Sequence, residues 1–358
     1  MSRRKAQVMH NILKNLPDTD KPYRSMTEIA DALGIDISTI SLVLSGSTKP
    51  GAYTRKRILD FCRKINFRPN SIAQALASGR SHLWGVLFPD VSSSFFPAIL
   101  EGIEKVANEN KFTAFLALSK YDIKLMEEQI SLMQSRLVEG FILVSPYAAD
   151  EYSYLRPVLA DSPVVPLLHP FRDEPNGKYI GVDNLTGSEL AMLHLISLGH
   201  KRIAYLRGPE GNFFSEIRQK VWHDFSVQNN LDCSDDYVRG DDFSCESGYK
   251  STKELMLLPN APTAIFSSSD YAALGAMEAL IDLGLKPGED VSVVGYDDIC
   301  CARHSPVPLT TVCQPKEEIG CCAAKALIAL INAELPDYKI LRPSLSIRRS
   351  SGPLKIKG

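Results

Sequence analysis

Hydrophobic positions change their spacing near Ser81, and this change divides the chain into two parts. Before it, apolar residues recur three and four positions apart in short segments, which predicts a small bundle of helices. After it, short apolar runs alternate with longer amphipathic segments. Strands that alternate with helices predict a parallel sheet with helices on both faces. Two such series follow one another, so we expect two α/β lobes of similar design.

The first part has the pattern of a helix-turn-helix. A helix is predicted from Thr27, and Gly34 supplies the positive φ that a tight turn requires. The second helix carries Ile40, which anchors it on the first, and a third helix starts at about Thr54. The Ala-rich segment Ser71–Ser78 follows, and it is too short to be stable as an isolated helix.

The second part predicts an alternating series of strands and helices. The expected strands are Leu83–Phe88, Thr113–Leu118, Phe141–Val144, Val164–Leu168, Tyr179–Val182, Ile203–Leu206, Ala264–Ser267 and Val291–Tyr296. The expected helices are Pro97–Asn110, Ile123–Arg136, Gly187–Leu198, Phe214–Gln228, Glu246–Leu257, Ala272–Leu283 and Lys316–Asn332.

Charge is divided at the same place as the hydrophobic pattern. The 358 residues include 40 Lys and Arg against 42 Asp and Glu, a net charge of −2. Residues 1–81 hold 14 of the basic and 6 of the acidic residues, so this part carries +8 and the remainder carries −10. A basic head on an acidic body predicts a polyanionic partner for the head alone.

The cysteines and the lengths of the apolar runs indicate the cellular compartment of the protein. The eight cysteines include no C-x-x-C pair, so we expect reduced and mostly buried thiols. No apolar run approaches the ~18 residues of a membrane span, and the N-terminus lacks the pattern of a signal peptide. These features predict a cytoplasmic protein without membrane contact. No motif for nucleophilic catalysis, metal binding or phosphate binding occurs, so no catalytic residue, metal site or cofactor is expected.

Several ungapped motifs carry a family resemblance. In the head they include Thr39-Ile40-Ser41-x-Val43-Leu44-Ser45-Gly46, Arg68-Pro69-Asn70-x2-Ala73-x2-Leu76 and Gly79-Arg80-Ser81. In the body they include Val182-Asp183-Asn184-x2-Gly187 and Asp290-Val291-Ser292-Val293-Val294-Gly295-Tyr296-Asp297-Asp298. Roughly residues 26–350 resemble the lac-repressor/gal-repressor (LacI/GalR) family of bacterial transcriptional regulators.

The resemblance implies an α/β protein with an N-terminal three-helix helix-turn-helix head, a hinge helix and a two-lobed, periplasmic-binding-protein-like (type I) effector domain with parallel sheets. The expected divisions are a flexible extension (1–25), the head (26–69), the hinge helix (70–81), a first effector lobe (82–183 and 315–340), a second effector lobe (184–314 and 341–350) and a tail (351–358). The chain would cross between the lobes near Asp183, Gln314 and Leu341.

The resemblance also implies a homodimer on a near-palindromic, double-stranded operator. Ile37, Ser38 and Leu42 would face the bases, and Leu42 stands where the family usually has a polar residue or Arg. A Leu can touch a thymine methyl group but cannot make a bidentate contact to guanine. The other expected DNA contacts are Thr27, Thr39, Ser41, Lys49, Tyr53, Thr54 and Arg55 in the head, and Asn70, Ser71, Ala73, Gln74 and the minor-groove wedge Leu76 in the hinge. A solvated helix face remains the alternative for the basic run that starts at Arg55.

A small, sugar-like effector would bind between the lobes. The residues implied to face it are Phe95 and Phe96 in the first lobe, and Asn212, Phe214, Arg218, Phe243, Ser269 and Asp297 in the second. A carboxylate accepts from paired hydroxyls, an Arg donates a planar fork, and an aromatic face covers the apolar side of a sugar. Core packing is the alternative for the two adjacent phenylalanines. Asp183 is interpreted as a possible helix cap and His200 as a structural residue.

The function predicted from these features is a ligand-responsive transcriptional repressor that is not an enzyme. The alternative is a solute-binding protein of a sugar transport system, which would explain the body but neither the +8 head nor the missing signal peptide. An enzyme on an α/β scaffold is a third possibility, and the missing nucleophile and metal motifs argue against it. A dimer is favoured over a tetramer because no leucine heptads follow Ser350.

Overall fold

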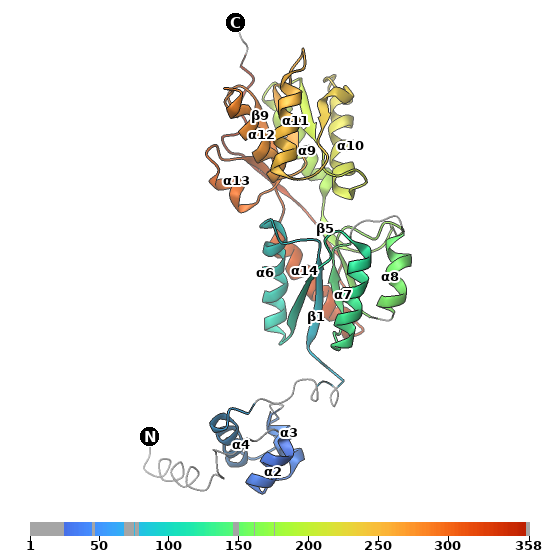
Figure 1. Ribbon diagram of the computed structural model, residues 1–358, viewed down its shortest axis with the longest axis vertical. Coiled ribbons are helices and arrows are strands. Elements are labelled where there is room, and N and C mark those ends of the chain that lie inside the picture. Colours follow the sequence, from blue (N-terminus) through green and yellow to red (C-terminus); the bar gives the residue numbers. More distant parts are fainter. Residues whose placement is uncertain are drawn as a thin grey trace, which may run out of the picture. The chain divides into compact units, whose positions relative to one another are not determined.

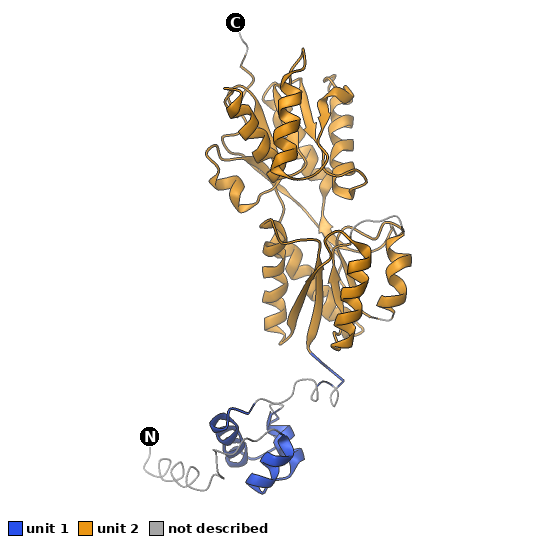
Figure 2. Ribbon diagram, viewed as in Figure 1, with its two compact units in different colours: residues 1–81 blue, residues 82–358 orange. Residues whose placement is uncertain are grey.

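The structure is a computed structural model that describes residues 25–44, 47–67, 75, 79–145, 150–160, 162–174 and 176–355. The chain forms two compact units, residues 1–81 and residues 82–358 (Figure 2). Each unit has a hydrophobic core of its own. The hinge residues Asn70, Ser71, Ala73, Gln74 and Leu76, and residues 1–24 of the expected N-terminal extension, lie outside the described residues.

Three short helices make up the described part of the first unit (Figure 1): α2 (Met26–Leu33), α3 (Ile37–Leu44) and α4 (Ala52–Lys64). The Ser25 hydroxyl caps α2 by accepting from the Glu28 N–H at 3.2 Å. Gly34 ends α2 with φ of 59°, the left-handed conformation expected of the turn. The helix-turn-helix prediction is confirmed, and α4 begins at Ala52, slightly earlier than expected.

The core of the first unit holds these helices together. Ile29 from α2, Ile40 from α3, and Ile58 and Phe61 from α4 are fully buried in one cluster. Burying a large aliphatic or aromatic side chain contributes about 1.5–3 kcal/mol. Ile40 therefore fixes the second helix of the motif against the first, as the sequence pattern predicts.

The first lobe of the second unit is built on a six-stranded sheet. Its strand order is β11-β5-β4-β3-β1-β2, and all neighbouring strands are parallel. The strands are β1 (Leu83–Phe88), β2 (Thr113–Leu118), β3 (Phe141–Leu143), β4 (Val164–Leu168), β5 (Ile180–Val182) and β11 (Ile340–Leu341). Helices α6 (Phe95–Glu109) and α14 (Lys316–Ile331) contribute to one core cluster, and α7 (Ile123–Ser135) and α8 (Glu151–Leu159) to another.

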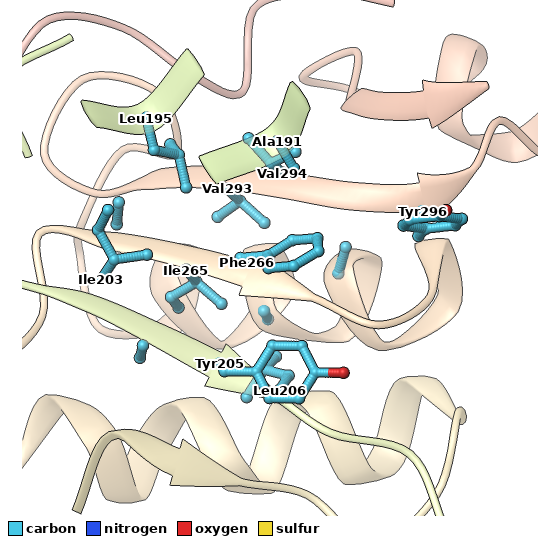
Figure 3. Packing of buried hydrophobic residues seen from close by; sticks show 14 of the residues in the cluster. Ala191, Leu195, Ile203, Tyr205, Leu206, Ile265, Phe266, Val293, Val294 and Tyr296 are labelled. Carbon is cyan, nitrogen blue, oxygen red and sulfur yellow. The ribbon is translucent and has the colours of Figure 1, made fainter. Parts of the chain in front are cut away.

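The second lobe repeats this design. Its sheet has the order β12-β10-β9-β8-β6-β7, and β12 alone is antiparallel to its neighbour. The strands are β6 (Ile203–Leu206), β7 (Val238–Arg239), β8 (Ala264–Ser267), β9 (Ser292–Asp297), β10 (Thr310–Cys313) and β12 (Ser344–Ser346). The helices are α9 (Asn184–Ser197), α10 (Phe213–Gln228), η1 (Asp235–Tyr237), α11 (Cys245–Met256), α12 (Asp270–Asp282) and α13 (Cys300–His304). Figure 3 shows its core, where β6, β8 and β9 contribute Tyr205, Phe266 and Tyr296.

The chain passes between the lobes three times. It leaves the first sheet after β5, leaves the second sheet after β10 to form α14, and leaves the first sheet again after β11 to form β12. The tail extends the second lobe, because the Leu354 N–H donates to the Leu198 carbonyl at 2.9 Å and the Gly352 N–H donates to Ser292 Oγ at 3.0 Å.

The structure corrects several expected elements. Helix α8 was not expected. It contains Pro157, and the carboxylate that caps it belongs to Asp173, which accepts from the N–H groups of Tyr152 and Ser153 at 2.7 and 2.8 Å. The short elements β7, β10, β11, β12, η1 and α13 were also not expected. Helix α6 begins at Phe95 rather than Pro97, so both adjacent phenylalanines lie in its first turn.

Two glycines let helices α6 and α14 pack so closely that the backbone of each helix contacts that of the other. A Cβ atom on Gly102 would overlap the Glu317 carbonyl oxygen, and one on Gly320 would overlap the Ile99 carbonyl oxygen. Because these neighbours are backbone atoms, they cannot move aside as a side chain would. The first lobe depends on this contact, since α14 returns to it after the chain has passed through the second lobe.

We expect Gly320→Ala to lower the free energy of unfolding by about 1–3 kcal/mol, the usual cost of overpacking. Urea denaturation followed by circular dichroism measures this loss. Lys325→Ala on the exposed side of α14 is the control and should stay within about 0.5 kcal/mol of the parent. Equal stability of the two variants would show that the helix contact has room for a methyl group.

Candidate functional site

Helix α3 has two different faces. Ile40 and Val43 are buried against the other helices of the head. Ile37, Ser38, Ser41 and Leu42 are exposed, and the two aliphatic side chains among them keep 44% and 38% of their surface in solvent. The structure thus places the three residues expected to face bases, together with Ser41, on the outer side of one helix.

The remaining head residues predicted to contact DNA lie within α3 or on either side of it in the sequence. Thr27, Lys49 and Tyr53 are exposed, while Thr39, Thr54 and Arg55 are partly buried. Lys56 is exposed and Arg57 is partly buried, so the basic run lies on the surface of α4. No shared geometry can be given for the five hinge residues, which fall among the residues not described.

Arg218 on α10 is a buried cation with a preset orientation. Its Nε and Nη2 donate to Asn184 Oδ1 at 3.1 and 2.9 Å, and its Nη1 donates to the Ser268 carbonyl at 2.5 Å. The guanidinium carbon lies 3.5 Å from the centre of the Tyr296 ring and 5.5 Å from that of Phe214. Among the described residues, at least three of its five N–H donors therefore have acceptors within the protein.

Asp297 lies at the end of β9, directly after Tyr296. Its Oδ1 accepts from Gln314 Nε2 at 2.7 Å, and the Lys316 ammonium donates to its backbone carbonyl. Burial raises the pKa of Asp297 to about 6, although the charges of Arg218 and Lys316 act in the opposite direction. Its φ of 120° is uncommon for a residue other than glycine, so the chain here holds the carboxylate in a strained conformation.

A second carboxyl group interacts electrostatically with Asp297. Asp270 is fully buried at the start of α12, where it accepts from the Ile299 N–H at 2.8 Å and from the Thr311 hydroxyl at 2.5 Å. Burial raises the pKa of Asp270 well above its usual value, and the negative charge of Asp297 adds to this effect. Two carboxyl groups in one buried region therefore disfavour a second negative charge.

Two of the predicted effector residues also cap helices. The Asn212 side chain accepts from the N–H groups of Phe214 and Ser215 at the start of α10. The Ser269 hydroxyl accepts from the Ala272 N–H and donates to the Phe243 carbonyl at 3.1 Å. The Asp183 carboxylate caps α9 by accepting from the Thr186 N–H at 3.0 Å, which confirms the cap interpretation.

The phenylalanines divide between core and lobe boundary. Phe96 is only 8% exposed and packs in the first-lobe core, so it supports its neighbour rather than presenting a free face. Phe95 lies edge-on to it at 5.2 Å and packs against the cores of both lobes. Phe214 belongs to the second lobe but also packs against the first-lobe core. The ring of Phe243 lies against Gly208, where any Cβ would overlap it.

His169 is a residue at this boundary that the sequence analysis missed. It follows β4 of the first lobe, is buried, and lies 5.6 and 5.5 Å from the rings of Phe213 and Phe214 in the second lobe. Burial lowers its pKa, so the ring is neutral at pH 7. Ser94 also joins the lobes, because its Oγ accepts from the Cys300 N–H at 3.2 Å. A lone histidine beside a proline gave no signal in the sequence.

His200, in contrast, has the structural role expected of it. Its Nδ1 pairs with the Thr263 hydroxyl at 3.1 Å, and its Nε2 lies 3.0 Å from Ser292 Oγ and 3.1 Å from the Gly352 carbonyl. The eight cysteines are free thiols, and most of them are at least partly buried, although Cys300 and Cys301 are exposed. Within the described ranges, no helix has the length and apolar character needed to cross a bilayer.

Comparisons with known proteins agree with this architecture. A family profile described as a periplasmic binding protein-like domain matches residues 192–351. The Probable HTH-type transcriptional repressor ExuR of Bacillus subtilis is 30% identical over 91% of this chain and 98% of its own length. The Ribose operon repressor of Haemophilus influenzae is 27% identical over 92% of this chain and 99% of its own length.

Among solved structures, a crystal structure of the lac repressor dimer bound to operator and the anti-inducer ONPF is similar to this chain. Its TM-score is 0.84 at 26% identity, and the match covers 93% of this chain and 100% of the other. A helix-turn-helix head joined to a two-lobed α/β domain defines a DNA-binding transcriptional regulator. The relatives extend over nearly the whole chain and include a repressor at 30% identity. The chain belongs to the lac-repressor/gal-repressor family of bacterial transcriptional regulators.

The family membership settles the alternatives raised by the sequence. The interpretation as a solute-binding protein of a transport system is wrong, because the relatives matched over more than 90% of the chain are transcriptional regulators. The interpretation as an enzyme is excluded for the same reason.

The raised pKa of Asp297 predicts a pH dependence of stability. An unfolded aspartate has a pKa of about 3.9, so between about pH 4 and pH 6 the folded chain holds a proton that the unfolded chain has released. The free energy of unfolding should therefore fall as pH rises through this window. Asp297→Asn should reduce that fall by roughly 1–3 kcal/mol, partly because the pKa of Asp270 also decreases when the neighbouring charge is removed.

Urea titrations at several pH values measure this effect. Leu185→Ala, an exposed and uncharged change on α9, is the control and should run parallel to the parent. If the free energy of unfolding of Asp297→Asn depends on pH in the same way as that of the parent, Asp297 is not the group responsible for the fall.

Proposed function

We propose that this chain is a homodimeric repressor that binds a near-palindromic operator. A small, sugar-like ligand binds between its lobes and either lowers or raises its affinity for that operator. The relatives support the dimer, the operator and a small ligand, since they include a lac repressor dimer bound to operator and an anti-inducer, and a ribose operon repressor. Such a protein acts in the cytoplasm and is associated with the nucleoid while bound to DNA.

The head supplies the DNA contacts in this proposal. The outer face of α3 enters the major groove, with Ile37, Ser38 and Leu42 toward base edges. Thr27, Thr39, Ser41, Lys49, Tyr53, Thr54 and Arg55 contact phosphates, which set the position of the head without reading sequence. In the hinge, Asn70, Ser71, Ala73 and Gln74 line the minor groove and Leu76 wedges between base pairs.

The ligand-binding part of the proposal rests on one observation. The residues that hold the two charged groups of the site lie where the chain crosses between the lobes. Arg218 is held by Asn184, which directly follows the first crossing. Asp297 is held by Gln314, which lies at the second crossing. A ligand that bonds to either charged group therefore acts on the segments about which the lobes turn.

The proposed ligand has hydroxyl groups and an apolar face. Paired hydroxyls would donate to Asp297 and accept from the remaining N–H groups of Arg218. Phe95 and Phe214, which already pack at the lobe boundary, would cover the ring face. Asn212, Phe243 and Ser269 complete the second-lobe wall in this proposal, while Phe96 acts by supporting Phe95.

The switch follows from two arrangements of the lobes. A ligand that binds one arrangement better shifts the population toward it, and the first lobe transmits the change to the hinge and the spacing of the two heads. By linkage, operator binding changes ligand affinity by the same factor. A thermal-shift screen against sugars and nucleosides identifies the ligand class, because a ligand that binds only the folded state raises its stability.

We expect Arg55→Ala to weaken binding to every duplex by a similar factor. Removing one phosphate contact should also reduce the slope of log K against log salt by about 0.9. Fluorescence anisotropy at several salt concentrations measures both effects on a selected and on a scrambled duplex. Lys325→Ala in the second unit is the control and should leave the slope unchanged. A loss confined to the selected duplex would mean that Arg55 reads sequence instead.

We expect Arg218→Lys to lower the affinity for the ligand found in the screen by about 10- to 100-fold, because Lys lacks the planar fork. Operator affinity without ligand should stay within about twofold of the parent. Calorimetry with the ligand and anisotropy with the operator separate the two readouts. If ligand binding stays unchanged while operator binding is lost, Arg218 has a purely structural role.

A further inference from the structure

The outer face of α3 combines apolar and hydroxyl side chains. An α-helix turns by about 100° per residue, so Ile37, Ser38, Ser41 and Leu42 fall within an arc of about 140°. Ile40 and Val43 lie on the opposite side and are buried in the head core. Ile37 and Leu42 stay 44% and 38% exposed, although the head buries the other aliphatic anchors of its helices.

This face lacks the groups that read purines by paired hydrogen bonds. Residues 37–44 contain no Arg, Lys, Asn or Gln, which are the side chains that make bidentate contacts to guanine or adenine. The Ser38 N–H donates to Asp36 Oδ1 at 2.8 Å, and the hydroxyl of Ser38 also bonds to Asp36, so the pKa of that carboxyl is lowered. Ser38 is thus partly committed to its own helix start.

The surroundings of the face nevertheless fit duplex DNA. The following helix, α4, carries Arg55, Lys56 and Arg57 in its first turns, and residues 1–81 have a net charge of +8. The major groove offers one apolar group among its polar base edges, which is the C5-methyl group of thymine. Burial of a single methyl group against an aliphatic side chain changes affinity by about fourfold.

We propose that this head reads its operator mainly through thymine methyl groups, which Ile37 and Leu42 contact in the major groove. The proposal rests on the proposed function, because it requires α3 to enter that groove. It assigns a specificity-determining role to two aliphatic side chains and identifies the bases that they read as thymines. Each half-site then contains at least one thymine whose methyl group touches Leu42 and one whose methyl group touches Ile37.

The test replaces thymine by uracil, which removes the methyl group and leaves every hydrogen-bonding group in place. The full chain first selects its preferred site from a library of random duplexes. Each thymine of that site is then replaced singly by deoxyuridine, and the Kd is measured at one fixed salt concentration. We expect a loss of about fourfold at a few positions, and about 16-fold when both half-sites are changed, because separate positions add.

Variants connect each position to its side chain. Leu42→Ala should bind the thymine duplex more weakly and show no further loss at one of the uracil-sensitive positions. Ile37→Ala should do the same at a different position. Ser41→Ala, on the same face, is the matched control and should weaken thymine and uracil duplexes equally. Both aliphatic side chains are exposed, and a thermal melt of each variant checks that the head stays folded.

The outcomes separate this inference from the proposed function. Sequence-specific binding that is insensitive to uracil at every position overturns the methyl readout and leaves the repressor proposal intact. Uracil penalties that persist unchanged in both Leu42→Ala and Ile37→Ala also overturn it. Failure of the full chain to select any sequence would overturn both proposals. Loss of dimerisation in Leu42→Ala, with the uracil penalty kept, would show that this face contacts protein instead.

Discussion

The second lobe is organised around a positive charge removed from water. Arg218 is 4% exposed, and a buried charge without partners is strongly unfavourable. Its partners are the Asn184 amide oxygen, the Ser268 carbonyl and the Tyr296 ring, all of them neutral. They orient the guanidinium without neutralising it. The positive charge therefore stays available to an approaching ligand and to the neighbouring carboxylate of Asp297.

This arrangement constrains residues that never approach a ligand. Tyr296 lies so close to α9 that a Cβ atom on Gly187 would overlap its hydroxyl, so the ring that supports the guanidinium requires glycine there. Asn184 is in place because the Asp183 cap starts α9 immediately before it. Asp298 is held by Arg348 at 2.6 Å, which joins the end of β9 to the chain that follows the third crossing. A hydrogen bond at or after each of the three crossings thus holds a residue of the site or its direct neighbour.

Local sequence signals predicted much of this structure, while long-range partners could not be predicted. Gly34 and Asp183 act on their own neighbours, so the turn and the cap were predicted correctly. Helix α8 was missed because its cap, Asp173, follows it in the sequence and reaches it only through the fold. Asn184 was recognised as part of a motif, but nothing nearby indicated that it accepts from an arginine 34 residues away. Family resemblance, not spacing, supplied the effector residues.

The two lobes differ in the kind of contacts that their buried groups make. In the second lobe, His200, Ser292, Thr310 and Ser350 form bonds that connect β9 and β10 to the C-terminal segment. Such networks rigidify a core when every member is satisfied. At the lobe boundary the first lobe contributes aromatic packing from Phe95 and His169 and the acceptor Ser94. Rings can slide past one another at small cost, whereas a network of hydrogen bonds resists displacement. Relative motion of the lobes should therefore preserve the second-lobe wall and change the position of Phe95 and His169 against it.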